Sequence, residues 1–313
     1  MRLLVSRAQT ARVSTILREE FGAEFRTKDA PMRVEEARAA LAEYDALLPT
    51  LGDAFGAEAF AGPVRAKLLA NFGVGVNHID LQAARAAGVN VTNTPGAVTD
   101  ATADIAMTLL LMSARRASEG ERMLRAGDWS GWAPTQMLGA HVTGKRLGII
   151  GMGRIGQAVA RRAHFGFGME IAYATRSPKD LPFTARPLPL PDVLAWADFV
   201  VLAVPATAET RNMIGAAELA AMRPHAHLIN VARGDVVDGV ALITALEAGQ
   251  IGGAGLDVYA QEPLVPEALR RLNNVTLLPH LGTATEEVRD AMGMMAIENL
   301  RAFRDGKALP NPV

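Results

Sequence analysis

The stretch "LGIIGMGRIGQAVARR", residues 147–162, constrains the fold of this chain more than any other segment. An apolar run leads into Gly151, Gly153 and Gly156, which have the G-x-G-x-x-G spacing, and an amphipathic helical pattern follows. Glycines at a strand-to-helix junction can serve the turn alone. In this context, however, they are typical of the turn that seats a dinucleotide pyrophosphate at a helix N-terminus. The segment therefore predicts cofactor contacts from Gly151, Met152, Gly153, Arg154, Ile155 and Gly156.

Alternating apolar and amphipathic segments on both sides of this turn predict an α/β fold. Before it, the first 98 residues alternate short strands such as "RLLVS" and "DALLP" with helices. From the turn onward, six apolar runs have the character of parallel strands buried on both faces: "KRLGIIG", "MEIAYAT", "DFVVLAVP", "AHLINVA", "GAGLDVY" and "VTLLP". We expect two doubly wound parallel-sheet domains, Rossmann-like or flavodoxin-like, with the active site in the cleft between them.

The domain boundaries are expected where this alternation breaks. Proline and glycine interrupt it at "TPGAVTDAT", and the final helix, "EEVRDAMGMMAIENLRAFRDG", has no strand after it. We expect that helix to pack back on the first domain. We therefore predict a substrate-binding domain of residues 1–98 plus 285–313, and a dinucleotide-binding domain of residues 99–284.

Composition excludes several other classes of protein. The 313 residues include 50% hydrophobic side chains, carry a formal net charge of −1 and contain no cysteine. The charge balance argues against a nucleic-acid or anionic-membrane partner, and the lack of thiols excludes disulfides, thiolate zinc sites and cysteine nucleophiles. No histidine pair has a metal-ligand spacing, so no metal is expected. A cytoplasmic protein with a small-molecule substrate is the expectation.

The strand after the glycine turn ends in a cationic cluster. Its sequence, "IAYATRSPK", carries Thr175, Arg176, Ser177 and Lys179, and the first acid is Asp180. An acid at this strand tip binds the ribose 2′-hydroxyl of NAD, whereas an arginine accommodates the 2′-phosphate of NADP. The pattern predicts a preference for NADPH/NADP+, with NADH/NAD+ possible. The alternative is that Arg176 is a solvated surface cation.

Three later strands each lead to a side chain with catalytic potential. Arg233 follows "HLINVA", Glu262 follows "GLDVYA", and His280 follows "VTLLP". Carboxyl ends of parallel strands share one edge of a sheet, so these side chains are expected to meet there. A guanidinium can hold a substrate carboxylate, a histidinium can protonate the adjoining carbonyl oxygen as hydride arrives, and a carboxylate can orient the imidazole. Alone, each residue would more often be structural or solvated.

The remaining histidines offer no comparable constellation. His141, His164, His225 and His227 lack such partners in the sequence, and we interpret His78 as structural. A serine triad lacks its nucleophile elbow, because no G-x-S-x-G occurs. The predicted chemistry is therefore reduction of a 2-keto acid with a nicotinamide cofactor.

Several motifs, taken in order, resemble the D-isomer-specific 2-hydroxyacid dehydrogenases, particularly their glyoxylate/hydroxypyruvate reductase branch: "NFGVGVNHID", "ATADIAMTLLL", "GKRLGIIGMGRIG", "NVARGDVVD", "GLDVYAQEP" and "LPHLGTAT". The resemblance covers almost the whole chain. It implies catalytic roles for Arg233, Glu262 and His280, and use of NAD(P)H without a metal. It also implies a homodimer formed through the nucleotide-binding domains and the loop before the glycine turn.

The resemblance further implies substrate and cofactor contacts that the residue patterns do not give. Leu51 and Gly52 match the first-domain wall of the substrate pocket, and Val74 and Gly75 match the amides that bind the substrate carboxylate. Trp132 matches an aromatic side chain that reaches the neighbouring subunit's site; the alternative is an interface or core tryptophan. Further cofactor contacts are implied for Thr102, Val204, Pro205, Thr210, Val231, Ala232, Asp257 and Gly282.

The expected activity is NADPH-preferring reduction of glyoxylate or hydroxypyruvate to the D-2-hydroxy acid. Two alternatives stay open. One is an NAD-dependent D-lactate or phosphoglycerate-type dehydrogenase, and the other is a dinucleotide-sensing binding protein of the corepressor type.

Overall fold

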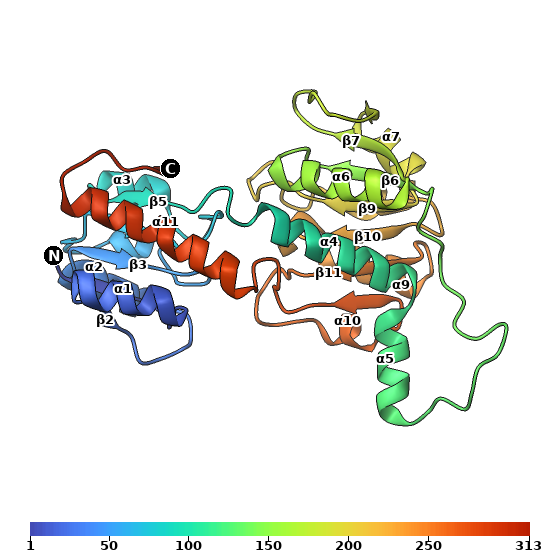
Figure 1. Cartoon of the computed structure of the whole chain (residues 1–313), viewed down its shortest axis with the longest axis horizontal. Coiled ribbons are helices and arrows are strands. Elements are labelled where there is room, and N and C mark those ends of the chain that lie inside the picture. The colour runs from blue at the N-terminus through green and yellow to red at the C-terminus, as the bar shows by residue number, and fades with distance from the viewer. The chain divides into compact units, whose positions relative to one another are not determined.

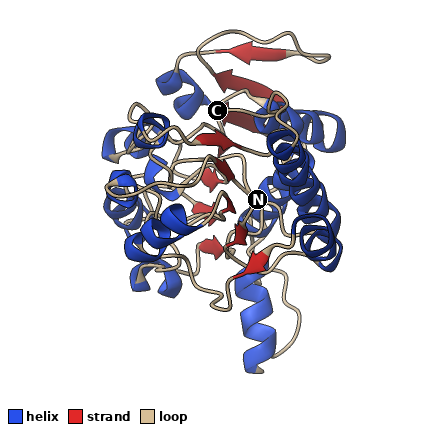
Figure 2. Cartoon of the chain, turned by 90° about the vertical axis from the view of Figure 1, so that its left-hand side faces the viewer, coloured by secondary structure: helices blue, strands red, loops and turns tan.

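The computed structural model describes residues 1–313 as two compact units (Figure 1). The first comprises Met1–Val98 and Thr283–Val313, and the second comprises Thr99–Gly282. Each unit has its own parallel β-sheet with helices beside the strands (Figure 2). The predicted fold class, α/β with two parallel-sheet domains, is confirmed.

The first unit is built on a five-stranded parallel sheet in the order β2-β1-β3-β4-β5. The three central strands are buried along their whole length, because apolar residues cover both faces of the sheet. The strands are β1 (Leu3–Val5), β2 (Glu24–Phe25), β3 (Ala46–Leu48), β4 (Leu68–Ala70) and β5 (Asn90–Thr92). The helices are α1 (Ala11–Phe21), α2 (Val34–Glu43), α3 (Leu81–Ala86), α11 (Glu286–Arg304) and a 3₁₀ helix, η1 (Ala57–Phe60).

Helix α11 returns the end of the chain to the first unit, where it packs against α1 and β4. Gly293 allows the close approach of α1, since a Cβ at this position would lie 2.4 Å from Cγ2 of Val13. The buried Asn299 of α11 holds the end of the chain by two hydrogen bonds to Asn311, of 3.0 Å and 3.1 Å. The last 31 residues, Thr283–Val313, therefore belong to this unit.

The second unit is built on a seven-stranded parallel sheet in the order β12-β11-β10-β9-β6-β7-β8. The strand order reverses between β6 and β9, which places a topological switch point beside the glycine turn. The strands are β6 (Arg146–Ile150), β7 (Glu170–Ala174), β8 (Ala185–Pro187), β9 (Phe199–Leu202), β10 (His227–Asn230), β11 (Gly253–Leu256) and β12 (Val275–Leu277). The helices are α4 (Thr99–Ala114), α5 (Ala117–Ala126), α6 (Arg154–Phe167), α7 (Leu190–Trp196), α8 (Ala216–Ala221), α9 (Gly239–Glu247), α10 (Glu267–Arg271) and a 3₁₀ helix, η2 (Gly234–Val236).

Alternate residues of the second sheet enter two separate hydrophobic cores. On β9, Phe199 and Val201 pack with α4 and α6, whereas Val200 and Leu202 pack with α7, α8 and α9. This alternation follows from the two-residue period of a strand. Because both faces of β9 are buried, every residue of the strand is apolar. No helix in the chain combines the length and apolar character needed to cross a membrane.

The sequence patterns do not indicate β2, β8 or α2. β2 has only two residues and β8 reads "ARP", and both lie at sheet edges, where one side of the strand has no neighbour. Edge strands need fewer apolar residues than central strands, so their signal is weak. α2 buries only Ala37, Ala40 and Leu41, which is a narrow apolar stripe.

Hydrogen bonds to Asp198 link the amino ends of three strands in the second sheet. Its carboxylate accepts hydrogen bonds from the backbone amide of Arg146 (3.0 Å), from the Arg223 guanidinium (3.0 Å) and from Nε2 of His225 (2.8 Å). Burial tends to raise the pKa of Asp198, but these hydrogen bonds lower it below its ordinary value. The sequence pattern does not indicate this partner of His225, because only the fold brings Asp198, the residue before β9, next to it.

His227, at the start of β10, also has a partner that the sequence does not indicate. Its Nδ1 lies 2.8 Å from Oγ of Ser113 on α4, and its ring stacks on Phe199 with centroids 5.5 Å apart. Burial, reinforced by the nearby charge of His225, lowers the pKa of His227 to about 4. His227 is therefore neutral in the folded protein at neutral pH, and its protonation opposes folding.

We predict that His227 makes the protein less stable as the solution is acidified. The imidazole takes up a proton near its ordinary pKa of 6.5 in the unfolded chain, but only near a pKa of about 4 in the folded chain. Since the unfolded state binds more protons in this window, the free energy of unfolding should fall by up to ~1.4 kcal/mol per pH unit through this group.

Urea unfolding of the wild type, His227→Asn and His141→Asn between neutral pH and about pH 4.5 measures this effect. His141 is an exposed histidine and serves as the control. His227→Asn alone should show a flatter dependence of unfolding free energy on pH. Equal slopes in the three proteins would contradict the prediction.

Candidate active site

Three neighbouring strands of the second sheet lead to the candidate catalytic side chains. β10, β11 and β12 are adjacent and parallel, so their carboxyl ends lie at one edge of the sheet. Arg233 follows β10, Glu262 follows β11 and His280 follows β12. In open parallel sheets this edge is where ligands bind.

Glu262 and His280 form a hydrogen-bonded pair. Nδ1 of His280 lies 2.8 Å from Oε2 of Glu262, and the backbone amide of Tyr259 donates to Oε1 at 3.0 Å. Since a carboxylate only accepts hydrogen bonds, the shared proton is assigned to Nδ1, and Nε2 has no hydrogen-bond partner. Burial tends to raise the pKa of Glu262, but the hydrogen bond and charge of His280 outweigh it and lower the pKa. The ionised carboxylate therefore orients the ring and leaves Nε2 available for proton transfer.

Asp257 anchors the segment that carries His280. Its buried carboxylate accepts hydrogen bonds from the backbone amides of Leu281 (2.6 Å) and Gly282 (2.9 Å), and its carbonyl accepts one from the amide of His280 (3.0 Å). Burial raises the pKa of Asp257, although the two amide hydrogen bonds oppose this shift. His280 itself has a φ of 55°, an unusual conformation for a residue with a Cβ, and these bonds hold it. The sequence pattern gives no sign of this anchoring.

Arg233 is held at the start of η2 by its neighbours. Asn230 donates to the carbonyl oxygen of Arg233 at 2.9 Å and accepts from the amide of Ala232 at 3.0 Å, while Nη1 of Arg233 donates to the Ala232 carbonyl at 2.7 Å. Burial lowers the pKa of Arg233, and the charges of Glu262 and Asp235 oppose this shift. A guanidinium keeps its proton in spite of such shifts, so the site contains a shielded cation suited to an anionic ligand.

The glycine turn has the geometry that a dinucleotide pyrophosphate requires. Gly151 has a φ of 98°, and a Cβ there would lie 2.6 Å from the Ala203 carbonyl oxygen. A Cβ on Gly156 would lie 2.1 Å from the carbonyl oxygen of Gly151, so α6 can lie this close to the turn only with glycine. The position of a Cβ on Gly153 faces open space, and the amides of Met152 and Gly153 donate no hydrogen bond within the protein. These amides, followed by Arg154 and Ile155 in the first turn of α6, fit a bound diphosphate.

The tip of β7 presents cationic and hydroxyl groups and no acid. Thr175, Arg176, Ser177 and Lys179 are all exposed, and Nζ of Lys179 lies 3.3 Å from Oγ of Ser177. Arg176 forms no ion pair, although its charge acts on the exposed Glu209 after β9. Its guanidinium is therefore accessible to a phosphate.

Apart from Thr102 on α4, the other residues implied as cofactor contacts come after strands of the same sheet. Oγ1 of Thr210 donates to the Pro205 carbonyl at 2.7 Å and accepts from the amide of Thr207 at 2.8 Å, which closes the loop after β9. Oγ1 of Thr102, on α4, donates to the Gly282 carbonyl at 3.1 Å. The full set along this edge is Thr102, Val204, Pro205, Thr210, Val231, Ala232, Asp257 and Gly282.

In the first unit, two asparagines hold the loop that follows β4. Nδ2 of Asn71 donates to the carbonyl oxygens of Gly73 (3.0 Å) and Gly75 (3.1 Å), and Nδ2 of Asn93 donates to that of Val74 (2.9 Å). The backbone amides of Val74 and Gly75 donate no hydrogen bond within the protein. This loop therefore offers two amide donors to a carboxylate. Leu51 and Gly52 form the turn after the neighbouring strand, β3.

Trp132 lies in the segment after α5, which projects from the second unit (Figure 1). The Trp132 side chain is 80% exposed. Three further large apolar side chains of α5 and this segment are exposed: Leu124 (62%), Trp129 (51%) and Leu138 (67%). An apolar surface of this kind is typical of a protein contact.

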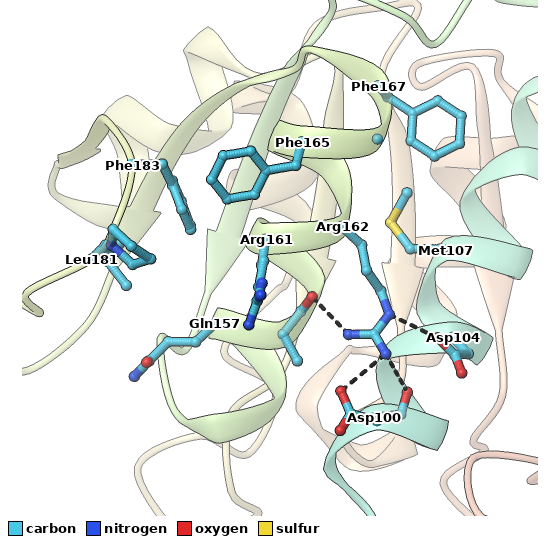
Figure 3. Close-up of a pocket in the computed structure, with 13 residues that line it drawn as sticks. Asp100, Asp104, Met107, Gln157, Arg161, Arg162, Phe165, Phe167, Leu181 and Phe183 are labelled. Atoms are coloured by element: carbon cyan, nitrogen blue, oxygen red, sulfur yellow. Dashed lines mark hydrogen bonds and ion pairs between the residues drawn. The ribbon is translucent and has the colours of Figure 1, made fainter.

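A separate hollow lies between α4, α6 and the segment after β7 (Figure 3). Phe165, Phe167 and Phe183 form its apolar wall, and Arg162 bonds with Asp100 (3.0 Å) and Asp104 (2.7 Å) at its other side. Both acids are thus already paired with Arg162. No group of three or more histidine, aspartate or glutamate side chains in the chain converges closely enough to hold a metal ion.

Comparison with known proteins identifies the family. The model described as "D-isomer specific 2-hydroxyacid dehydrogenase, NAD binding domain" matches residues 107–282. A glyoxylate reductase from Thermococcus gammatolerans is 44% identical over 319 residues, which cover 100% of this chain and 95% of that relative.

Solved structures agree with this match. A protein of Thermus thermophilus is 42% identical, with a TM-score of 0.92 and coverage of 100% of both chains. An NADPH-dependent glyoxylate/hydroxypyruvate reductase of Sinorhizobium meliloti, in complex with NADP and malonate, is 37% identical, with a TM-score of 0.88 and coverage of 100% of this chain and 96% of that one. The resemblance inferred from the sequence motifs is thereby confirmed, and the glycine turn belongs to a nicotinamide dinucleotide-binding unit. The chain is an oxidoreductase that belongs to the D-isomer specific 2-hydroxyacid dehydrogenase family.

Proposed function

We propose that this protein reduces a small 2-keto acid, glyoxylate or hydroxypyruvate, to the D-2-hydroxy acid, with NADPH as the preferred cofactor. The observation that carries the proposal is the 2.8 Å hydrogen bond between Glu262 and His280. The charge of the half-buried Arg233 acts on the same Glu262. An oriented proton donor and a shielded cation are the two groups that reduction of a keto acid requires from the protein.

In this proposal, the residues divide the reaction between them. Arg233 binds the substrate carboxylate, and the free amides of Val74 and Gly75 are the donors that the first unit offers to an anion of the same class. When bound, the dinucleotide supplies a hydride to the carbonyl carbon. Nε2 of His280 donates a proton to the carbonyl oxygen as the π electron pair moves onto that oxygen, and the neutral imidazole then regains a proton from solvent. Glu262 accepts the hydrogen bond of Nδ1–H and so keeps the ring oriented with Nε2 available for the transfer.

The comparisons support the substrate class. The Thermococcus gammatolerans relative is named glyoxylate reductase, and the Sinorhizobium meliloti structure is named NADPH-dependent glyoxylate/hydroxypyruvate reductase. We assign dinucleotide binding to the unit of residues 99–282 and binding of the keto acid mainly to the other unit. The absence of an acid at the tip of β7, with Arg176 unpaired there, supports NADPH over NADH.

A panel of initial rates tests the proposed function. Glyoxylate, hydroxypyruvate, pyruvate and phenylpyruvate are each assayed with NADPH and with NADH. The proposal predicts the highest kcat/KM for glyoxylate or hydroxypyruvate with NADPH. A clear preference for pyruvate with NADH would support a D-lactate dehydrogenase instead, and dinucleotide binding without turnover of any keto acid would support a sensing protein.

Substitution of the proposed proton donor and anion-binding residue should have different kinetic effects. His280→Asn should lower kcat by ~10²–10⁴-fold with little change in KM, because it removes the general acid. Arg233→Met should raise KM for the keto acid by ~10–100-fold, because it removes a charge-assisted contact to the carboxylate. Steady-state kinetics of both variants, with exposed His141→Asn as the control, measures this. Turnover close to wild type in either variant would overturn the assignment.

Substitution of Arg176 tests the proposed cofactor preference. Arg176→Asp should lower the ratio of kcat/KM for NADPH to that for NADH by at least ~10-fold, since a carboxylate repels the 2′-phosphate. Arg270→Asp, on exposed α10, introduces the same charge change elsewhere in the unit and should leave the ratio unchanged. Survival of the NADPH preference in Arg176→Asp would mean that Arg176 is only a surface cation.

We also propose a homodimer in which the segment after α5 contacts the second copy. Leu138→Glu should weaken the dimer, measured by size-exclusion chromatography with light scattering. Val240→Glu, which alters another exposed apolar side chain, on α9, should leave the dimer unchanged.

Trp132→Ala should alter the preference among keto acids more than the affinity for the cofactor. Unchanged kcat/KM across the keto-acid panel would reject a substrate role for Trp132.

A further inference from the structure

Two arginines of the first unit lie near the carboxyl edge of its sheet without an acidic partner. Arg7 follows β1 and lies beside the turn after β3, where Nη2 is 3.5 Å from the Leu51 carbonyl oxygen. A Cβ on Gly52 would lie 3.7 Å from the same nitrogen. Arg7 is therefore in contact with both residues that we assign to the wall of the substrate pocket.

The Arg7 guanidinium has few hydrogen bonds for its degree of burial. Its Nε is buried and has no hydrogen-bond partner. At 3.5 Å, the bond of Nη2 to Leu51 is at the limit of a hydrogen bond, and Arg7 forms no ion pair. A shielded guanidinium with unused donors is costly unless an anion binds it.

Arg289, on α11, is a second cation of this kind. Its Nε donates to the Thr283 carbonyl at 3.0 Å, and its guanidinium lies 5.9 Å from the ring centroid of Phe72, which precedes the amide loop after β4. Burial lowers the pKa of Arg289, and no carboxylate opposes this shift. Arg289 forms no ion pair either.

Two acids of the same region, Asp53 and Asp290, bond to partners other than Arg7 and Arg289. The buried Asp53 accepts hydrogen bonds from the backbone amides of Met32 and Thr50, both at 2.8 Å. Asp290 accepts a hydrogen bond from Thr10 and pairs with Arg12 at 3.9 Å. Neither acid neutralises Arg7 or Arg289, so this edge of the sheet is left with a positive charge.

We propose that Arg7, assisted by Arg289, binds a second anionic group on longer substrates, so that of two 2-keto acids of equal length the enzyme favours the one that carries a distal carboxylate. This inference rests on the proposed function, because it concerns the end of the keto acid opposite the reacting carbonyl. Within the first unit, we assign the amides of Val74 and Gly75 to the first carboxylate and the turn at Leu51 and Gly52 to the remainder. Arg7 is the cation in contact with that turn.

Oxaloacetate and 2-oxobutyrate form a matched pair of probes, because both have four carbons and only the first has a distal carboxylate. The wild type should reduce oxaloacetate with a kcat/KM at least ~10-fold above that for 2-oxobutyrate, and Arg7→Met should lower this ratio by at least ~10-fold. The loss should appear mainly in KM. Arg7→Lys should restore part of the ratio, since the charge is kept. Arg85→Met removes an exposed arginine of α3 in the same unit and should leave the ratio unchanged.

Calorimetric titration of the NADP+-bound protein with D-malate and D-2-hydroxybutyrate gives a readout that does not need turnover. Arg7→Met should weaken binding of D-malate by at least ~10-fold and change that of D-2-hydroxybutyrate much less. If both ligands and both substrates lose equally, Arg7 is structural and the inference is wrong, while the proposed function stands. If the wild type reduces no keto acid, the proposed function fails, and the titration alone decides the inference.

Discussion

The candidate active site depends on the parallel direction of the strands in the second sheet. Because β10, β11 and β12 run side by side in one direction, residues that follow them at well-separated positions in the sequence come to one edge. Asp198 ties the amino ends of β6, β9 and β10 together, and Asp257 holds the segment after β12. The same alignment that permits a continuous apolar core thus sets the position of Arg233, Glu262 and His280.

Strand periodicity and strand ends account for most of what could be predicted. The central strands, the glycine turn and the residues after β10, β11 and β12 follow from patterns that lie within a few neighbouring residues. The partners of Asp257, Asn93 and His225 do not follow, because each bond joins a side chain to atoms that only the folded chain brings near. The sequence pattern does not predict edge strand β8 for another reason: a strand with a neighbour on one side only needs few apolar residues.

The arginines discussed above differ in whether an acid neutralises them, and this difference indicates which ligands the molecule can bind. Arg162, Arg223 and Arg26 are neutralised by acids, as is usual for cations that serve structure. Arg7, Arg289 and Arg176 form no ion pair, and Arg233 is a half-buried cation. Three of these four belong to segments at the carboxyl ends of strands, where ligands bind in parallel sheets. Anionic substrates and a phosphorylated cofactor are the ligands that such positions favour.

Transfer of deuterium from cofactor to product tests the central claim most directly. Hydroxypyruvate is incubated with the protein and NADPH that carries deuterium at both positions on C4 of the nicotinamide, and the product is analysed by NMR and chiral chromatography. The account predicts D-glycerate with deuterium on C2, formed far more slowly by His280→Asn than by the wild type. Glycerate without deuterium on C2, or the L isomer, would contradict it.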